Sequence, residues 1–199
     1  MFSAAPIGGR ASRPRSASAA LPMLPEIAPG QLWLVEAPAA KGAPSAPVRH
    51  ALDGANVVIY DRALAGRLAV SFPLGAYAEP APAGENSGAA AASRCIRFAR
   101  DGWSVARLLP PRLPRRERAR RIREFADQLA AARVPGSLPV RVLAEAAYGI
   151  REEAGTRLDG LADTVATYDR ETRLAIVIDA FGGGVAATPQ AVAGNGLAG

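Results

Sequence analysis

The sequence predicts a doubly wound α/β domain with a mainly parallel sheet. Short apolar runs alternate with stretches of helical periodicity along most of the chain. The run of residues 57–60, Val-Val-Ile-Tyr, is continuously apolar, which suits a strand covered on both faces in a parallel sheet. Asp61 follows this run directly, and the carboxyl ends of strands are where open α/β sheets bind ligands. An ordinary core strand that ends on a turn-forming aspartate explains the same residues, so both interpretations stay open here.

Composition limits the classes of protein to which the chain can belong. Its 199 residues are 49% hydrophobic, enough for one domain with a core. The net charge is +6, and all of the 24 basic residues except Lys41 are arginines. The single cysteine, Cys95, excludes an internal disulfide, and with only one histidine a zinc site of the Cys/His kind is excluded. No apolar stretch approaches the ~18–20 residues that span a bilayer, so we expect a cytoplasmic protein.

The two ends have a composition that differs from the rest. Residues 1–29 are rich in Ala, Ser, Pro and Arg, with no acidic residue before Glu26, which predicts a disordered leader or a start codon placed too early. Import into an organelle through this Arg- and Ser-rich leader is the minor alternative. Residues 185–199 are expected to form a flexible tail. Gly182–Gly184 is interpreted as its hinge, because no Gly-Lys-Ser/Thr motif follows.

The first half of the chain gives short elements. A strand is predicted at 31–37, after the turn residues Pro29-Gly30, and a helix at 47–54, where His50 is expected to be a bystander. The remaining expectations are a strand at 56–61, a short strand around 68–74 and a Pro/Ala/Gly loop at 79–88.

The second half contains the clearest helices. Ser87 is a candidate N-cap for a helix at 87–101, which Gly102 would stop. The i, i+3, i+4 spacing of apolar residues at 115–133 predicts an amphipathic helix. Strands are predicted at 103–109 and 139–143, with residues 143–147 as the entrance to a helix. A last strand at 174–181 would pair with residues 164–168 across 169–172.

Residues 51–64, which contain the pattern AL..A.VVIYDR.L, resemble the first βαβ unit of the tetrapyrrole methylases, in particular those of the uroporphyrinogen-III C-methyltransferase type. The succession of helix, Gly102 and a strand that ends in Arg107-Leu108 is also similar to that family. The resemblance covers residues 30–148 and implies a methylase-like α/β domain there. It makes 149–184 a remnant of the second domain or a C-terminal extension.

The resemblance implies S-adenosylmethionine-dependent methyl transfer in tetrapyrrole biosynthesis, the pathway of sirohaem and cobalamin. The residues at the positions of the family's cofactor loops are Glu36, Ala37, Asp61, Pro110, Pro111 and Arg112. Two glycine-rich loops of the family are replaced here by the sequences EAPAAKG at 36–42 and PPRLP at 110–114. The alternative is therefore a non-catalytic binding or partner module that keeps the fold. No catalytic residue is assigned.

Arginines are concentrated at the start of the helix at 115–133. Seven arginines and one acidic residue, Glu117, lie between Arg112 and Arg123. They can form a solvated helix face, a site for a polycarboxylate, or a nucleic-acid site, and the scarcity of nearby aromatic residues argues against the last. The resemblance favours a tetrapyrrole polycarboxylate, with Arg107, Arg115, Arg116 and also Arg120 as candidate substrate-binding residues. A partner protein or a second copy of the chain is the other expected partner, and no metal is expected.

Overall fold

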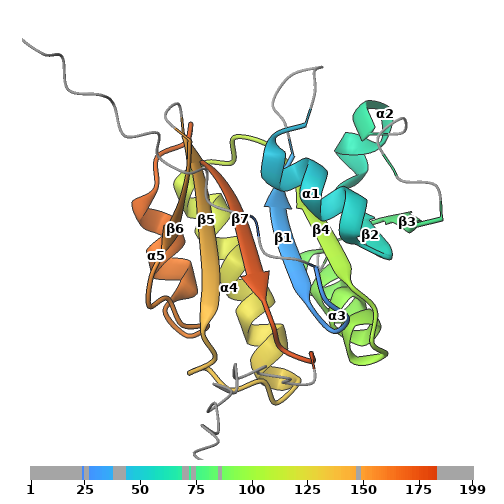
Figure 1. Cartoon of the computed structure of the whole chain (residues 1–199). Helices are drawn as coiled ribbons and strands as arrows, with labels where there is room; N and C mark the ends of the chain where they lie inside the picture. Colours follow the sequence, from blue (N-terminus) through green and yellow to red (C-terminus); the bar gives the residue numbers. More distant parts are fainter. Residues whose placement is uncertain are drawn as a thin grey trace, which may run out of the picture.

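The computed structural model describes residues 24, 27–37, 44–68, 72, 75–84, 87–146 and 149–182. They form one seven-stranded sheet with helices on both faces (Figure 1). The strands are β1 (Leu32–Glu36), β2 (Val57–Tyr60), β3 (Tyr77–Pro80), β4 (Val105–Leu109), β5 (Val140–Ala146), β6 (Gly149–Glu153) and β7 (Arg173–Ile178). The helices are α1 (Ala46–Gly54), η1 (Arg62–Leu64), α2 (Ala65–Leu68), α3 (Ser87–Arg100), α4 (Arg115–Ala131) and α5 (Leu161–Thr167).

The strand order is β3-β2-β4-β1-β7-β5-β6. The first four strands in this order are mutually parallel, β7 runs antiparallel to both β1 and β5, and β6 is antiparallel to β5. The predicted α/β class is thus confirmed, and all four of the strands expected in a mainly parallel sheet are present, although the sheet is parallel in one half and antiparallel in the other. β5 points in the same direction as β1, but β7 lies between them, so both neighbours of β5 are antiparallel to it.

Helices cover the two faces of the sheet unequally (Figure 1). Apolar residues of α3, α4 and α5 pack on one face, together with Leu32, Leu34 and other side chains of alternate strand positions. The opposite face carries Trp33 and Val35, over which α1 packs with Val48, Ala51 and Leu52. Because β1 and β4 lie between these layers, every one of their residues is buried, which explains their continuous apolar sequence.

The end of α3 confirms the predicted stop at Gly102. Gly102 has a φ of +85°, its N–H donates to the Ala99 carbonyl, and the Trp103 N–H donates to the Phe98 carbonyl. This pair of bonds is the Schellman motif, in which a glycine adopts the left-handed conformation that closes a helix. The turn directs the chain immediately into β4.

The prediction of a strand around 68–74 is wrong for Leu68, which is the last residue of α2. Residues 69–71, 73 and 74 lie outside the described residues. The strand of this region is β3 at Tyr77–Pro80, which the sequence analysis placed partly in a loop. β3 is an edge strand that pairs only with β2, and an edge position tolerates Pro80 because no further strand needs its N–H.

Two expectations in the last third are also wrong. Residues 143–146 continue β5, because β6 folds back on β5 as an antiparallel hairpin and supplies its backbone partners. Residues 164–167 of the expected strand at 164–168 instead belong to α5, whose Leu161, Ala162 and Val165 lie on one buried helical face, and Tyr168 is its C-cap. β7 therefore pairs with β1 and β5 and not with residues 164–168.

The end segments contribute to the sheet and its core. Leu24 and Ile27, within the segment expected to be a leader, are partly buried against the cluster that contains Trp33. Range 149–184 contributes β6, α5 and β7, and β7 lies between β1 and β5. The tail at 185–199 and residues 183 and 184 of the expected hinge lie outside the described residues, as do residues 1–23.

Candidate functional site

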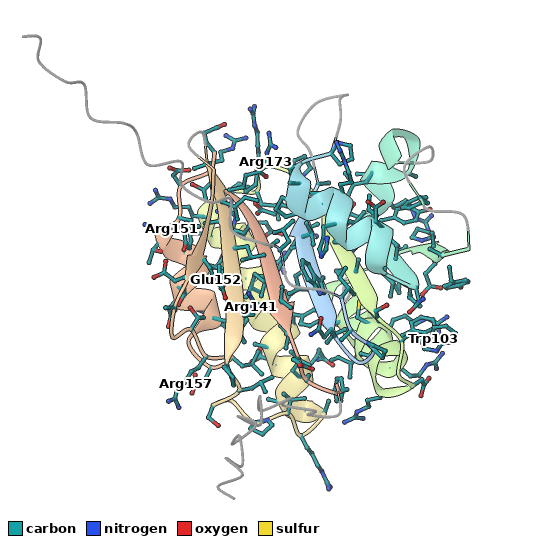
Figure 2. All side chains as sticks on the ribbon, in the orientation of Figure 1. Trp103, Arg141, Arg151, Glu152, Arg157 and Arg173 are labelled. Atoms are coloured by element: carbon teal, nitrogen blue, oxygen red, sulfur yellow. The ribbon has the colours of Figure 1, made fainter. Side chains whose placement is uncertain are left out.

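The carboxyl ends of β1, β2 and β4 lie at one edge of the sheet and bring the predicted site residues into two separate places. Beside β1 is a cavity of about 30 Å³ that is lined by Glu36, Ala37, Pro111, Arg112, Arg170, Glu171 and Arg173. Beside β2 and β4 is a cavity of about 190 Å³ that is lined by Asp61, Arg62, Ala81, Pro82, Ala83, Gly84, Ser87, Gly88, Arg107 and Arg121. In Figure 2, Arg173 marks the edge at which β1 ends, and Arg157 lies at the opposite edge.

Glu36, at the end of β1, is held by a buried ion pair. The Nε of Arg118 lies 2.7 Å from Oε1 and its Nη2 lies 3.3 Å from Oε2, while the Leu174 N–H donates to Oε2 at 3.1 Å. Arg118 also donates to the carbonyls of Asp169 and Thr172, at 3.0 and 3.1 Å. Burial raises the pKa of Glu36, and the attraction of Arg118 opposes this rise. The pair joins α4 to β1 and to the start of β7.

The predicted cofactor residues near β1 leave little space. The N–H of the buried Ala37 donates to the Leu109 carbonyl at 3.0 Å. Arg112 has a φ of +54°, and its carbonyl accepts a hydrogen bond from Arg170 while its guanidinium pairs with Glu171 at 3.3 Å. Pockets that enclose cofactor-sized ligands measure ~300–1,000 Å³, an order of magnitude above this cavity. In the part of the chain that the structure describes, the cavity that Glu36, Ala37, Pro111 and Arg112 line is thus smaller than a pocket that encloses a cofactor. Pro110, half-buried beside them, lines neither cavity.

Asp61 supports the second cavity from the end of β2. One carboxylate oxygen accepts the Ala63 N–H at 3.0 Å and so caps η1. The other lies 3.3 Å from Nη1 of Arg121, whose Nε donates to Glu117 at 2.8 Å. Asp61 and Glu117 thus position Arg121 at the wall of the cavity.

Arg107 is the most buried charged residue of this cavity, with 5% of its surface exposed. Its Nη1 donates to the carbonyls of Leu108 and Ile59, at 2.9 and 3.3 Å. Among the described residues no carboxylate forms an ion pair with it. Burial lowers the pKa of this guanidinium, although an arginine remains protonated at neutral pH. Asp61 attracts this guanidinium without forming an ion pair with it, and a buried cation beside a cavity favours an anionic ligand.

The other predicted arginines have different surroundings. Arg115 and Arg116 are exposed at the start of α4 and line neither cavity. Arg120 pairs with Glu117 and Glu124 on the surface of the same helix. Sequence reasoning did not single out Arg118, although its spacing from Ile122, Phe125 and Leu129 puts it on the buried face of α4. This spacing is the feature of the sequence from which the burial of Arg118 can be predicted. The ring of His50 lies 5.6 Å from that of Trp33, outside both cavities.

The Glu117 carboxylate gives α4 a measurable dependence on pH. Hydrogen bonds from Arg120 and Arg121 lower its pKa from 4.5 to about 2. The stabilisation is present above pH 4.5 and is lost as the pH falls toward 2, because the unfolded chain then binds a proton that the folded chain does not. We expect the difference in urea midpoint between wild type and Glu117→Gln to be larger at pH 7 than at pH 3. An equal difference at both pH values would contradict this role.

Neither a metal site nor a membrane span is found among the described residues. These residues contain no group of three or more His, Cys, Asp or Glu side chains that could hold a metal ion. None of the described helices is long and apolar enough to cross a membrane.

Comparisons with known proteins give distant similarity to solved structures alone. No protein-family model and no curated protein matches the sequence. Among solved structures, the chain is similar to cobalt precorrin-4 methyltransferase, described as a cobalamin biosynthetic enzyme. The identity is 12% and the TM-score 0.32, and the match covers 73% of this chain and 93% of that enzyme. At these values the similarity does not assign an activity to this chain.

Proposed function

We propose that the chain is a binding module for an anionic, carboxylate-bearing small molecule of the tetrapyrrole type, with a methylase-like α/β fold. The observation that carries the proposal is the arrangement of charges at the carboxyl edge. Arg107 is buried without a carboxylate partner in the described structure, whereas Glu36, where the resemblance implies cofactor contact, is bound within the protein by Arg118.

Further arginines around these two cavities support a ligand with several carboxylates. Arg112, Arg170 and Arg173 line the cavity beside β1, where Glu36 and Glu171 are the acidic residues among the described part of the lining. Arg62, Arg107 and Arg121 line the other cavity, where Asp61 is the single acidic residue among the described residues of the lining. A guanidinium group binds a carboxylate through two parallel N–H groups, so such an edge suits a polycarboxylate.

The test is calorimetric titration of the full chain with uroporphyrin and, separately, with S-adenosylmethionine. We expect uroporphyrin to bind with a micromolar dissociation constant, about −8 kcal/mol, and S-adenosylmethionine to give no heat of binding. The double variant Arg62→Ala/Arg112→Ala, which removes one arginine from the lining of each cavity, should bind uroporphyrin at least tenfold more weakly.

The matched control is Arg97→Ala/Arg157→Ala, which removes the same charge from exposed positions that line neither cavity. Equal weakening in both double variants, or loss of binding on a modest rise in salt, would identify nonspecific attraction and contradict the proposal.

Methyl transfer is the second candidate, and the topology of the sheet favours it. β1, β4, β2 and β3 are parallel neighbours, and their carboxyl ends form the edge at which α/β enzymes bind cofactors. The same titration separates the candidates. Micromolar binding of S-adenosylmethionine, together with a raised melting temperature, would favour the methyltransferase over the binding module.

A further inference from the structure

Arginines of this protein repeatedly hold carboxylates by the same edge of the guanidinium, the one formed by Nε and Nη2. Arg118 binds Glu36 in this way at 2.7 and 3.3 Å, Arg94 binds Glu79 at 2.8 and 3.3 Å, and Arg141 binds Glu152 at 2.7 and 3.0 Å. Arg107 donates only through Nη1, to the two carbonyls of Ile59 and Leu108. No hydrogen bond from its Nε or Nη2 to a described residue is found, and neither atom is fully closed off from solvent, although only 5% of the surface of Arg107 is exposed.

The start of α3 borders the same cavity. Ser87 and Gly88, the first two residues of this 14-residue helix, line it together with Arg107. The first N–H groups of a helix lack partners within the helix, and the helix dipole places positive potential there. The Ser87 N–H donates to the Gly84 carbonyl, and no such bond to a described residue is found for the next amides, those of Gly88 and Ala89. Helix amides and a buried guanidinium are two independent features that both favour an anion.

The acidic residues nearby already have partners. Asp61 lines the cavity and is held by the Ala63 N–H and by Arg121. Glu117 lies beyond Arg121 and binds it from the other side. Glu124, close to Gly88, pairs with Arg120. Among the described residues none of these carboxylates forms an ion pair with Arg107, although Asp61 attracts its guanidinium electrostatically.

The volume limits what the cavity can hold. At about 190 Å³ it is smaller than the ~300–1,000 Å³ that enclose a complete drug-sized ligand. It is large enough for a carboxylate on a short aliphatic arm, while the rest of a larger ligand would remain over the open edge of the sheet.

We infer that this cavity is the anchor for one carboxylate of the ligand, which the Nε–H and Nη2–H groups of Arg107 bind as a pair, with the amides at the start of α3 as additional donors. The inference rests on the proposed function and deepens it, because it assigns the chemical class that the site selects and the residue that selects it.

The first experiment measures selectivity with small probes. Glutarate, its neutral analogue glutaramide and inorganic phosphate are titrated into the full chain, and binding is followed by calorimetry. We expect glutarate to bind at least tenfold more tightly than glutaramide, because the neutral amide offers no charged oxygens to the guanidinium. Phosphate, which a guanidinium also binds through two oxygens, is the comparison with another class of anion and should not bind more tightly than glutarate. Tighter binding of phosphate, or equal binding of glutaramide, would overturn the assignment to carboxylates.

Two sets of variants test the position of the anchor. Arg107→Lys keeps the charge but lacks the paired donors, and should lower the affinity for glutarate at least tenfold. Ala83 is exposed at the cavity, so Ala83→Glu places a competing carboxylate there without altering the core, and Ala83→Gln is its uncharged control of similar size. Glutarate should bind Ala83→Glu at least tenfold more weakly than Ala83→Gln. If Ala83→Glu and Ala83→Gln bind glutarate equally, the assignment of the anchor to this cavity is overturned, even if Arg107→Lys fails to fold.

Uroporphyrin titrated into the same variants distinguishes this inference from the function on which it rests. If uroporphyrin binds wild type, Ala83→Glu and Ala83→Gln equally, the anchor is wrong and the proposed function stands. If glutarate binds as expected and uroporphyrin does not bind at all, the carboxylate anchor stands and the tetrapyrrole ligand is wrong.

Discussion

Replacement of Arg118 by methionine is expected to lower the free energy of unfolding by about 3–5 kcal/mol, the usual loss when one partner of a buried ion pair is removed. The Glu36 carboxylate, 3% exposed, would then remain in the core without its counter-ion. The carbonyls of Asp169 and Thr172 would also lose a donor, which loosens the contact of α4 with the start of β7.

Urea unfolding of four proteins measures this effect: wild type, Arg118→Met, Glu36→Leu and the double variant. The double variant should be more stable than Arg118→Met, because it leaves no buried charge unpaired. Arg116→Met is the matched control on the same helix. Since Arg116 is exposed, its replacement should change stability by less than about 1 kcal/mol. Equal effects of Arg118→Met and Arg116→Met would contradict the structural role of the pair.

The second large effect is expected at Trp33, whose side chain is completely buried in the middle of β1. It packs against the layer that contains α1, and its Nε1 donates to the side chain of Gln31 at 3.3 Å. Trp33→Ala should cost about 3–5 kcal/mol, because it removes apolar contacts from a strand that is covered on both faces and leaves a cavity.

The other tryptophan provides the control for this experiment. Trp103 is 49% exposed just before β4, so Trp103→Ala should change the free energy of unfolding by far less. Chemical denaturation followed by circular dichroism avoids reliance on tryptophan fluorescence, which both substitutions alter. A loss of stability in Trp103→Ala as large as that in Trp33→Ala would contradict the assignment of β1 to the centre of the core.

The sequence predicts those elements whose own residues form an apolar run or an apolar period. β1, β2 and β4 are apolar at nearly every position, and α4 has the periodicity of a helix with one buried face. β3 was missed because its pairing depends on a distant strand, and β6 was missed because its sequence, Gly-Ile-Arg-Glu-Glu, has no apolar pattern. β3, with the sequence Tyr-Ala-Glu-Pro, has no apolar pattern and exists as a strand because β2 offers it hydrogen bonds.

The site could be predicted in part, for similar reasons. Asp61 and Arg107 lie at the cavity because they occupy or directly follow strands that end at the same edge. An arginine within the apolar run of β4 is itself a signal, since a buried strand rarely contains a charge without a specific use. The pairing of Glu36 with Arg118 joins residues 82 positions apart, and nothing in the local sequence of either residue indicates it.

The most direct measurement of the central claim is the NMR signal of the Arg107 side-chain Nε–H during titration with glutarate or uroporphyrin. We predict that this signal and the amide signals of Gly88 and Ala89 shift together and saturate at the same ligand concentration, because one carboxylate contacts both groups. If instead only the exposed arginines Arg112, Arg115 and Arg116 respond and Arg107 does not, the ligand is held by surface charge, and the account of a carboxylate site at this edge is contradicted.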